Sequence, residues 1–234
     1  MFIAETIARI RERIAASARR VGRDPQSITL MAVSKTVEPA RIIEAYAAGV
    51  RVFGENRVQE FQEKQTALSR LEDVQWHLIG HLQTNKARKT VEVFNAVDSL
   101  DSLRLAEKLD QAAAQLNKIL PVLVEINVGG ESSKSGVPLD SPELEGLLLG
   151  AARLEHLEIL GLMAVPPVTD NPDAARPYFR LLRDLRDSIA ARRLPRISMD
   201  VLSLGMSHDF EVAIEEGSTS VRVGSAIFGE RPRP

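Results

Sequence analysis

Lys35 is the residue whose type and position predict covalent chemistry. It follows the apolar run 28–33, which shows no polar alternation and therefore predicts a short strand buried on both faces. Glu38 and Pro39 then open an amphipathic helix. Burial at such a strand-to-helix turn makes an amine a nucleophile that can form a Schiff base with an aldehyde. The alternative is a solvated lysine just beyond the strand.

Two segments late in the chain predict a site for a phosphate group. Gly205-Met206-Ser207 and Gly224-Ser225 each combine glycine with a serine at the start of a helix. Glycine lets backbone N–H groups approach an anion closely, and the helix dipole favours negative charge at that end. In a (β/α)8 barrel, the loops after strands seven and eight are the usual phosphate site. Each segment taken alone is more often an ordinary turn.

A nucleophilic lysine and a phosphate cradle together indicate pyridoxal 5'-phosphate (PLP) as the ligand. Lys35 holds the aldehyde as an imine in this interpretation, and the cradle holds the phosphate. Arg222 lies two residues before Gly224 on the last predicted strand, so the two share a face. An arginine there can reach the pyridine nitrogen, keep it unprotonated and weaken the ring as an electron sink. The alternative for Arg222 is an ion pair with a neighbouring strand.

The elements that must position these residues alternate regularly between strand and helix. Short apolar runs predict strands at 28–33, 50–53, 75–80, 94–97, 120–128, 157–165, 199–204 and 220–223. Helical patterns lie between them, without a linker or a change in composition. The sequence therefore predicts an α/β protein, a single (β/α)8 TIM barrel over residues 1–234 with an outer N-terminal helix. A doubly wound open sheet is disfavoured because no G-x-G-x-x-G follows the first strand.

Composition and charge exclude several classes of function. The 234 residues carry a formal net charge of -2 and no cysteine, which excludes disulfides and thiolate metal sites and fits a cytoplasmic protein. No apolar run approaches the ~18 residues that span a bilayer. The basic residues Lys86, Arg88 and Lys89 lack interleaved aromatics, so no nucleic-acid partner is predicted. His77 and His81 lie at a strand-to-loop turn, where their spacing does not converge on a metal.

Seven segments resemble the pyridoxal phosphate homeostasis protein family. They are 32–36 (AVSKT), 53–60 (FGENRVQE), 76–86 (WHLIGHLQTNK), 125–128 (EINV), 161–164 (GLMA), 204–207 (LGMS) and 221–229 (VRVGSAIFG). The resemblance implies a barrel like the N-terminal domain of alanine racemases, of fold type III among PLP-binding proteins. It also implies a cofactor on Lys35, phosphate contacts from the cradle, and Arg222 near the pyridine nitrogen. The implied cofactor-binding residues are Lys35, Asn56, Ser207, Arg222, Gly224 and Ser225.

Three functions are compatible with these residues: a non-catalytic PLP carrier, a PLP-dependent amino-acid racemase, and an aldolase with a phosphorylated substrate. Racemisation needs a proton-transfer group on each ring face, yet Tyr46 and Tyr178 fall inside predicted helices. The sequence ends at Pro234 without the β-domain of racemases. An aldolase needs paired carboxylates or a lysine partner that are not evident. We therefore expect a cytoplasmic, monomeric PLP homeostasis protein without robust catalysis. It buffers PLP or delivers it to PLP-dependent apoenzymes.

Overall fold

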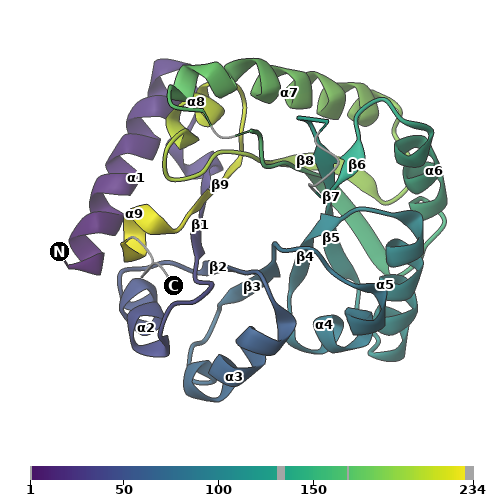
Figure 1. The fold of residues 1–234 in the computed structure, drawn as a ribbon, viewed down its shortest axis with the longest axis horizontal. Coiled ribbons are helices and arrows are strands. Elements are labelled where there is room, and N and C mark those ends of the chain that lie inside the picture. The colour runs from purple at the N-terminus through teal and green to yellow at the C-terminus, as the bar shows by residue number, and fades with distance from the viewer. Residues whose placement is uncertain (1, 131–134, 168, 230–234) are drawn as a thin grey trace.

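Eight parallel strands close into a ring in the computed structural model, which describes residues 2–130, 135–167 and 169–229 (Figure 1). Each strand pairs with the next, and β4 pairs with β5 to complete the ring begun by β9 and β1. The strands are β1 (Thr29–Val33), β2 (Val52–Glu55), β3 (Gln75–Leu78), β4 (Ala96–Leu100), β5 (Leu120–Asn127), β7 (Leu157–Met163), β8 (Ile197–Ser203) and β9 (Ser220–Val223). The predicted (β/α)8 barrel is confirmed. The predicted domain bounds 1–234 extend beyond the described residues at both ends.

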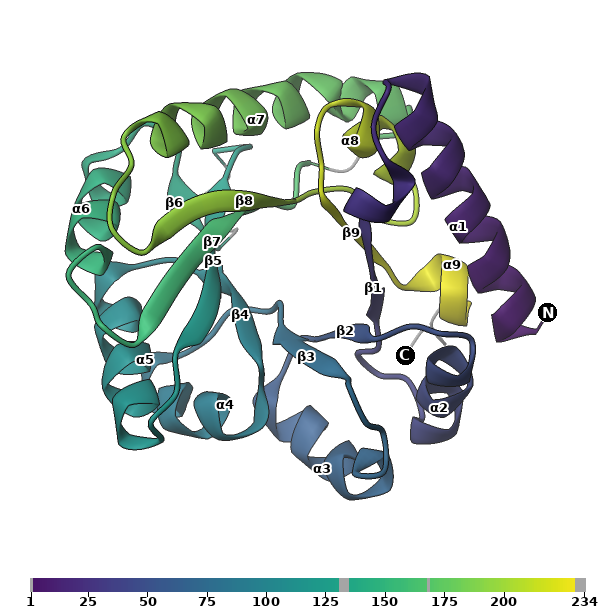
Figure 2. The ribbon, with the colours of Figure 1, turned by 180° about the vertical axis from the view of Figure 1, so that it is seen from behind.

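Helices surround this ring in both ribbon views (Figures 1 and 2). Side-chain caps mark two of their starts: Ser102 accepts a hydrogen bond from the N–H of Leu105, and Ser141 from that of Leu144. The helices are α1 (Ile3–Arg20), α2 (Pro39–Ala47), α3 (Val58–Leu68), α4 (Ala87–Val93), α5 (Leu103–Gln115), α6 (Pro142–Ala151), α7 (Arg176–Ala191), α8 (Phe210–Glu215) and α9 (Ser225–Phe228). Three 3-10 turns, at Pro25–Ser27, Thr84–Lys86 and Pro172–Ala175, and a two-residue strand β6 (Val137–Pro138) beside the end of β5 complete the described elements.

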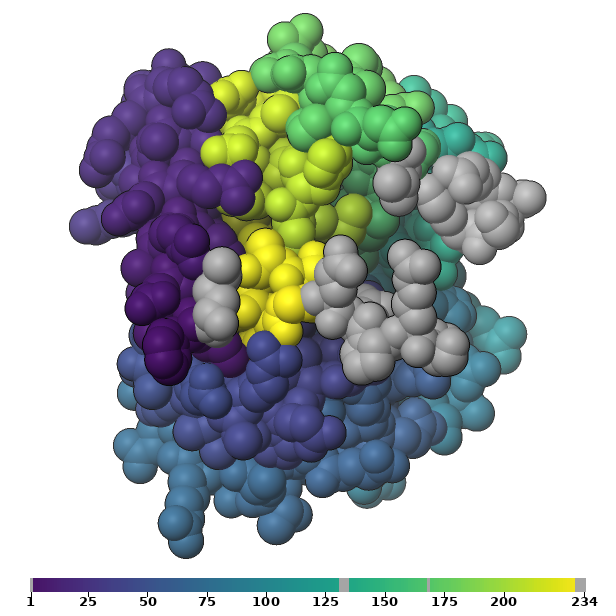
Figure 3. Space-filling model, turned by 60° about the vertical axis from the view of Figure 1, so that its left-hand side comes forward, coloured from purple at the N-terminus to yellow at the C-terminus, as the bar shows by residue number. Residues whose placement is uncertain are grey.

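The helix α1 packs on the outside of the barrel, as its isoleucine spacing predicts. Ile3, Ile7, Ile10 and Ile14 are all buried. The helix contacts α2, α8 and α9, so the first and last parts of the chain lie side by side (Figure 3). Arg11 adds hydrogen bonds of 2.9 and 2.8 Å to the carbonyls of Ala48 and Gly49. The helix therefore covers the junction between the end and the beginning of the barrel.

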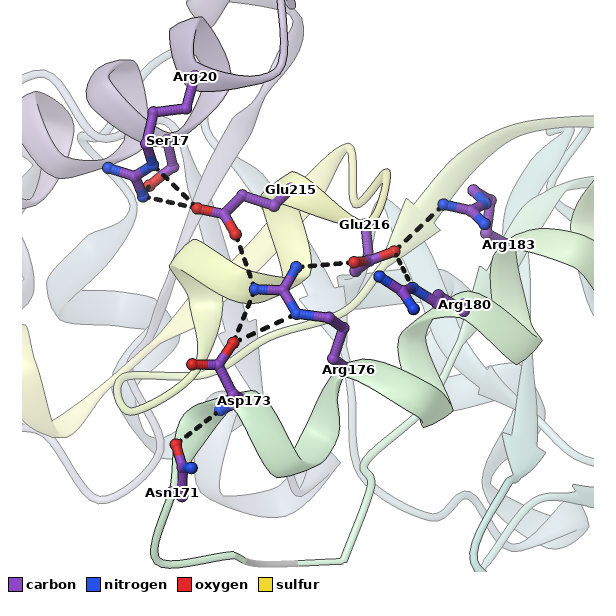
Figure 4. A network of polar contacts seen from close by, with 9 residues as sticks. All are labelled: Ser17, Arg20, Asn171, Asp173, Arg176, Arg180, Arg183, Glu215 and Glu216. Atoms are coloured by element: carbon purple, nitrogen blue, oxygen red, sulfur yellow. Dashed lines mark hydrogen bonds and ion pairs between the residues drawn. The ribbon is translucent and has the colours of Figure 1, made fainter.

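A network of ion pairs joins α8 to α7 and α1 (Figure 4). Glu216 is 5% exposed and accepts hydrogen bonds from Arg176 at 2.7 Å, Arg180 at 2.9 Å and Arg183 at 3.2 Å. Glu215 bridges Arg176 and Arg20. Burial acts to raise the pKa of Glu216, but Arg180 and Arg176 outweigh it and lower that pKa. Because α8 follows the Gly205–Ser207 loop, the network anchors the helix behind that loop.

Two strands lie further along the chain than predicted. β2 ends at Glu55 and β4 at Leu100, beyond the expected ends at 53 and 97. The strand residues Glu55, Asp98 and Ser99 are polar but at most 1% exposed. A pattern of hydrophobic residues predicts that such polar residues lie in loops. In the structure, hydrogen-bond partners from neighbouring segments allow them to be buried in strands.

Gly161 is required where β7 pairs with β8. A Cβ atom built on Gly161 would lie 1.7 Å from the carbonyl oxygen of Val201, a backbone atom that cannot rotate away. We expect Gly161→Ala to lower the free energy of unfolding by about 3 kcal/mol or more. Gly146 in α6 is the matched control, since its Cβ would meet nothing within 4 Å. Gly146→Ala should raise stability by about 0.5–1 kcal/mol. Urea titrations of both variants test this, and equal effects would contradict it.

Candidate cofactor-binding site

Lys35 lies directly after β1, partly buried, in a tight turn at the carboxyl end of the barrel. The N–H of Ser34 donates to the carbonyl of Gly54 at 2.9 Å, which continues the pairing of β1 with β2. Thr36 has a φ of 61°, an unusual conformation for a β-branched residue. The N–H of Val37 then returns to the carbonyl of Ser34 at 3.0 Å. The predicted position at a strand-to-helix turn is confirmed.

The two predicted phosphate segments meet in space. The hydroxyl of Ser207 accepts a hydrogen bond of 3.2 Å from the N–H of Ala226, which joins the loop after β8 to the first turn of α9. Gly205 has a φ of 88°, and a Cβ there would lie 2.8 Å from Cα of Phe210. No described residue accepts a hydrogen bond from the backbone N–H of Ser207, Gly224 or Ser225. N–H donors without an acceptor on two loops that touch each other suit an anion.

The cradle lies on the same end of the barrel as Lys35 and next to it in the strand order. β9 pairs in parallel with β1, and Ala32 is opposite Val223. A Cβ on Gly224 would lie 3.3 Å from Cβ of Val33, so the two strand ends are in close contact. Lys35 and the loop with Gly224 and Ser225 therefore follow the ends of two adjacent strands at the barrel mouth.

Arg222 is 4% exposed and binds the ends of two neighbouring strands. Its Nη1 donates to the carbonyl at 2.6 Å and the hydroxyl at 2.7 Å of Ser203, and its Nη2 donates to the carbonyl of Ala164 at 2.7 Å. No ion pair of Arg222 is found among the described residues, and the guanidinium is bound to backbone and hydroxyl oxygens of the neighbouring strand ends instead. Burial lowers the pKa of Arg222, and Asp98, Glu125 and Asp209 oppose that effect. A guanidinium has five N–H donors, and the two others have no acceptor in the described part of the chain.

Asn56 follows β2 at the same end of the barrel and is partly buried. Its backbone packs on Gly80 so closely that a Cβ on this glycine would lie 2.4 Å from the carbonyl oxygen of Asn56. No described residue forms a hydrogen bond with the Asn56 side chain. The amide is therefore available to a ligand at the mouth, and its contact with a cofactor stays a prediction.

Buried acidic groups in the barrel were not assigned a role from the sequence. His77 contacts Asp98 at 2.9 Å, and the other Asp98 oxygen, Oδ2, is buried with no partner in the described residues. The Oε2 of Glu125 is in the same situation, and Glu125 borders a cavity of about 150 Å³ together with Asn127, Ser135 and Val165. The sequence does contain a signal for the buried carboxyl of Glu125, since this residue lies inside 120–128, the most apolar predicted strand.

The two histidines of the H-x-x-x-H pattern have different partners. His77 pairs with Asp98, whereas His81 pairs with Asp101 at 3.0 Å. Over residues 2–130, 135–167 and 169–229, no group of three or more His, Cys, Asp or Glu side chains could hold a metal ion. The aspartates orient the imidazole rings at the barrel mouth instead.

The chain matches the family model described as "Alanine racemase, N-terminal domain" over residues 6–232. It therefore belongs to that family, the class of barrel that the fold indicates. The pyridoxal phosphate homeostasis protein of Aquifex aeolicus is 46% identical over 227 residues, 97% of each chain. The protein of the same name from Escherichia coli K12 is 44% identical and covers 98% of this chain and 97% of its own. Within the class, the chain belongs to the pyridoxal phosphate homeostasis protein family, as its sequence segments predict.

Solved structures agree with this assignment. PipY of Synechococcus elongatus PCC7942, in a structure described as having PLP bound, is 39% identical with a TM-score of 0.81 and covers 94% of this chain and 100% of PipY. Alanine racemase from Streptomyces coelicolor is 22% identical with a TM-score of 0.69, and the match covers 96% of this chain but 59% of the racemase. At 22% identity, the similarity to this racemase shows a shared fold only.

Glu125 provides a pH-dependent test of the buried site. Burial raises the pKa of Glu125 to about 7, aided by Asp101 and opposed by Arg222 and His81. An unfolded chain releases this proton near pH 4.5, so the folded state binds it more tightly between pH 4.5 and 7. The free energy of unfolding should therefore fall as pH rises through this window. In Glu125→Gln that loss, on the order of 2–3 kcal/mol, should disappear.

Urea unfolding at pH 5 and pH 8 measures this difference. Glu158→Gln, at the opposite end of the barrel on β7, is the control and should keep the pH dependence of the wild type. A Glu125→Gln variant with an unchanged pH dependence would show that this carboxyl titrates normally.

Proposed function

We propose that this protein binds PLP and serves PLP homeostasis, by buffering the cofactor or delivering it to PLP-dependent apoenzymes. One observation carries the proposal. Lys35 follows β1, and the N–H donors of Ser207 and of Gly224 and Ser225 follow β8 and β9, the next strands of the ring. The names of the relatives and the PLP-bound structure described for PipY support it.

The residues present fit the chemical groups of PLP. Lys35 supplies the amine for a Schiff base with the aldehyde, and the converging N–H donors and the Ser207 hydroxyl suit the phosphate. Arg222 has two N–H groups left for an acceptor such as a pyridine nitrogen. Asn56 lines the same mouth. When bound, PLP supplies an electrophilic aldehyde and an electron-accepting ring.

The proposed role is that of a carrier without robust catalysis. Tyr46 lies in α2, where the guanidinium of Arg51 stacks 4.1 Å from its ring centre, and Tyr178 lies in α7. Neither tyrosine is at a strand end of the barrel. A positively charged Arg222 beside the pyridine nitrogen would keep that nitrogen unprotonated and weaken the ring as an electron sink. The positions of the two tyrosines and of Arg222 therefore both disfavour racemisation.

The remaining parts of the proposal concern the setting of the protein. Among the helices of the described residues, none is long and apolar enough to cross a membrane. We propose a cytoplasmic monomer; the absence of cysteine is compatible with a reducing compartment.

Replacing Lys35 tests the covalent link. Lys35→Arg keeps the positive charge but has no amine that can form an imine, so we expect a folded protein without the visible imine band after PLP is added. Absorbance, borohydride reduction and peptide mass mapping measure the link. Lys89→Arg, an exposed lysine in α4, is the control and should keep the band. An irreversibly reduced PLP adduct on another peptide of Lys35→Arg would contradict the assignment.

Ser207 tests the phosphate cradle. Charge-assisted hydrogen bonds contribute about 1.5–3 kcal/mol, so Ser207→Ala should bind PLP roughly 10- to 100-fold more weakly. Its affinity for pyridoxal, which lacks the phosphate, should stay unchanged. Ser188→Ala on the exposed side of α7 is the control. Titrations that weaken both ligands equally would place Ser207 outside the phosphate site.

A further inference from the structure

A buried charge cluster lies beneath the turn that carries Lys35. Lys64 of α3 has a side chain only 10% exposed, and its Nζ lies 2.8 Å from Oε1 of Glu60 and 3.3 Å from Oε1 of Glu55. Glu55 at the end of β2 has no exposed surface. Burial raises the pKa of Glu55, whereas Lys64 and the N–H of Thr36 help to lower that of Glu60.

The cluster binds the backbone on both sides of Lys35. Before it, the hydroxyl of Ser34 donates to Glu55 at 2.7 Å, and the carbonyl of Ser34 accepts from Nζ of Lys64 at 3.0 Å. After it, the N–H of Thr36 donates to Glu60. Thr36 has a φ of 61°, and a left-handed conformation costs roughly 1–2 kcal/mol for an L-residue. Its carboxylate partner on α3 offsets that cost and holds the turn in this shape.

Stability alone does not explain this cluster, because burying charges is costly. Taking an ion pair out of water costs several kcal/mol, and hydrophobic residues of similar size often stabilise a fold as well or better. In this cluster the charges bind one another and also the peptide groups of Ser34 and Thr36. The cluster therefore restricts the direction in which the backbone presents the side chain between them.

We propose that Lys64 is a positioning residue for Lys35, acting through Glu55, Glu60 and the backbone of the turn. This inference rests on the proposed function, because that proposal assigns Lys35 as the amine that binds PLP. A lysine side chain has four carbon–carbon torsions and therefore many conformers. A fixed backbone reduces the number of positions that the amine can occupy, so it meets an aldehyde held by the cradle more often. Without Lys64, two carboxylates remain together without their cation and the turn relaxes.

Three variants and a matched control test this role. Lys64→Met removes the cation, and Glu60→Ala removes the acceptor of the Thr36 N–H from a side chain that is 24% exposed and so tolerates replacement. Lys64→Arg restores the charge and the donors. Lys118→Met is the control, because Nζ of Lys118 also donates to a backbone carbonyl, that of Val91 at 3.1 Å, away from this turn.

Two rates and the fold are measured for each protein. The first rate is the growth of the imine band after PLP is mixed with the protein. The second is the labelling of Lys35 by trinitrobenzenesulfonate in PLP-free protein, followed by peptide mass mapping. Circular dichroism and urea unfolding show whether each variant is folded.

We expect Lys64→Met and Glu60→Ala to form the imine about tenfold more slowly and to change the Lys35 labelling rate while they remain folded. Lys64→Arg should recover part of the imine rate, and Lys118→Met should match the wild type. Folded Lys64→Met and Glu60→Ala with wild-type rates would overturn the inference. If Lys64→Met does not fold, Glu60→Ala decides the question. A wild-type protein that forms no imine would refute the proposed function, whereas the labelling rates would still test the positioning role.

Discussion

The parallel pairing of β9 with β1 is the interaction on which the site depends. It joins the last strand of the ring to the first and places Val223 opposite Ala32, so that Gly224 follows beside Val33. Almost 190 residues separate Lys35 from the cradle segment 224–225 along the chain. Closure of the barrel brings them to one edge because all eight strands run in the same direction. An open sheet that left β1 and β9 apart would keep every motif and lose the site.

The buried cations Arg222 and Lys64 both bind backbone carbonyl groups. Arg222 binds the carbonyls of Ser203 and Ala164, and Lys64 binds that of Ser34. A buried cation that hydrogen-bonds to carbonyls ties strand ends together, because its removal leaves several acceptors without a donor. The same cations lie near carboxylates, Glu125 for Arg222 and Glu55 for Lys64. Burial raises the pKa of Glu125 and lowers that of Arg222, and the charge of each group opposes the shift of the other.

The comparison with alanine racemases separates fold from function. Identities of 14–22% accompany TM-scores near 0.7, and this chain covers only 57–62% of those enzymes. A shared barrel at that level of identity leaves the activity open. The homeostasis relatives match this chain at 44–46% identity over nearly their whole length. Lys35, Ser207 and Gly224 follow strand ends of this chain, while both tyrosines lie in outer helices.

The sequence by itself determined the features that depend on local pattern. Alternating strand and helix runs predicted the barrel, the apolar run before Lys35 predicted its place at a strand end, and the glycine–serine segments predicted two loops at one end of the barrel, which the structure brings into contact. Only the tertiary structure decided which polar residues are buried and what they bind. Glu55 binds Ser34 and Lys64, and Asp98 binds His77, so residues from other segments allow both to extend their strands, whereas Glu125 borders a cavity. Burial of a charge depends on contacts between segments far apart in the chain, and hydrophobic periodicity contains no record of them.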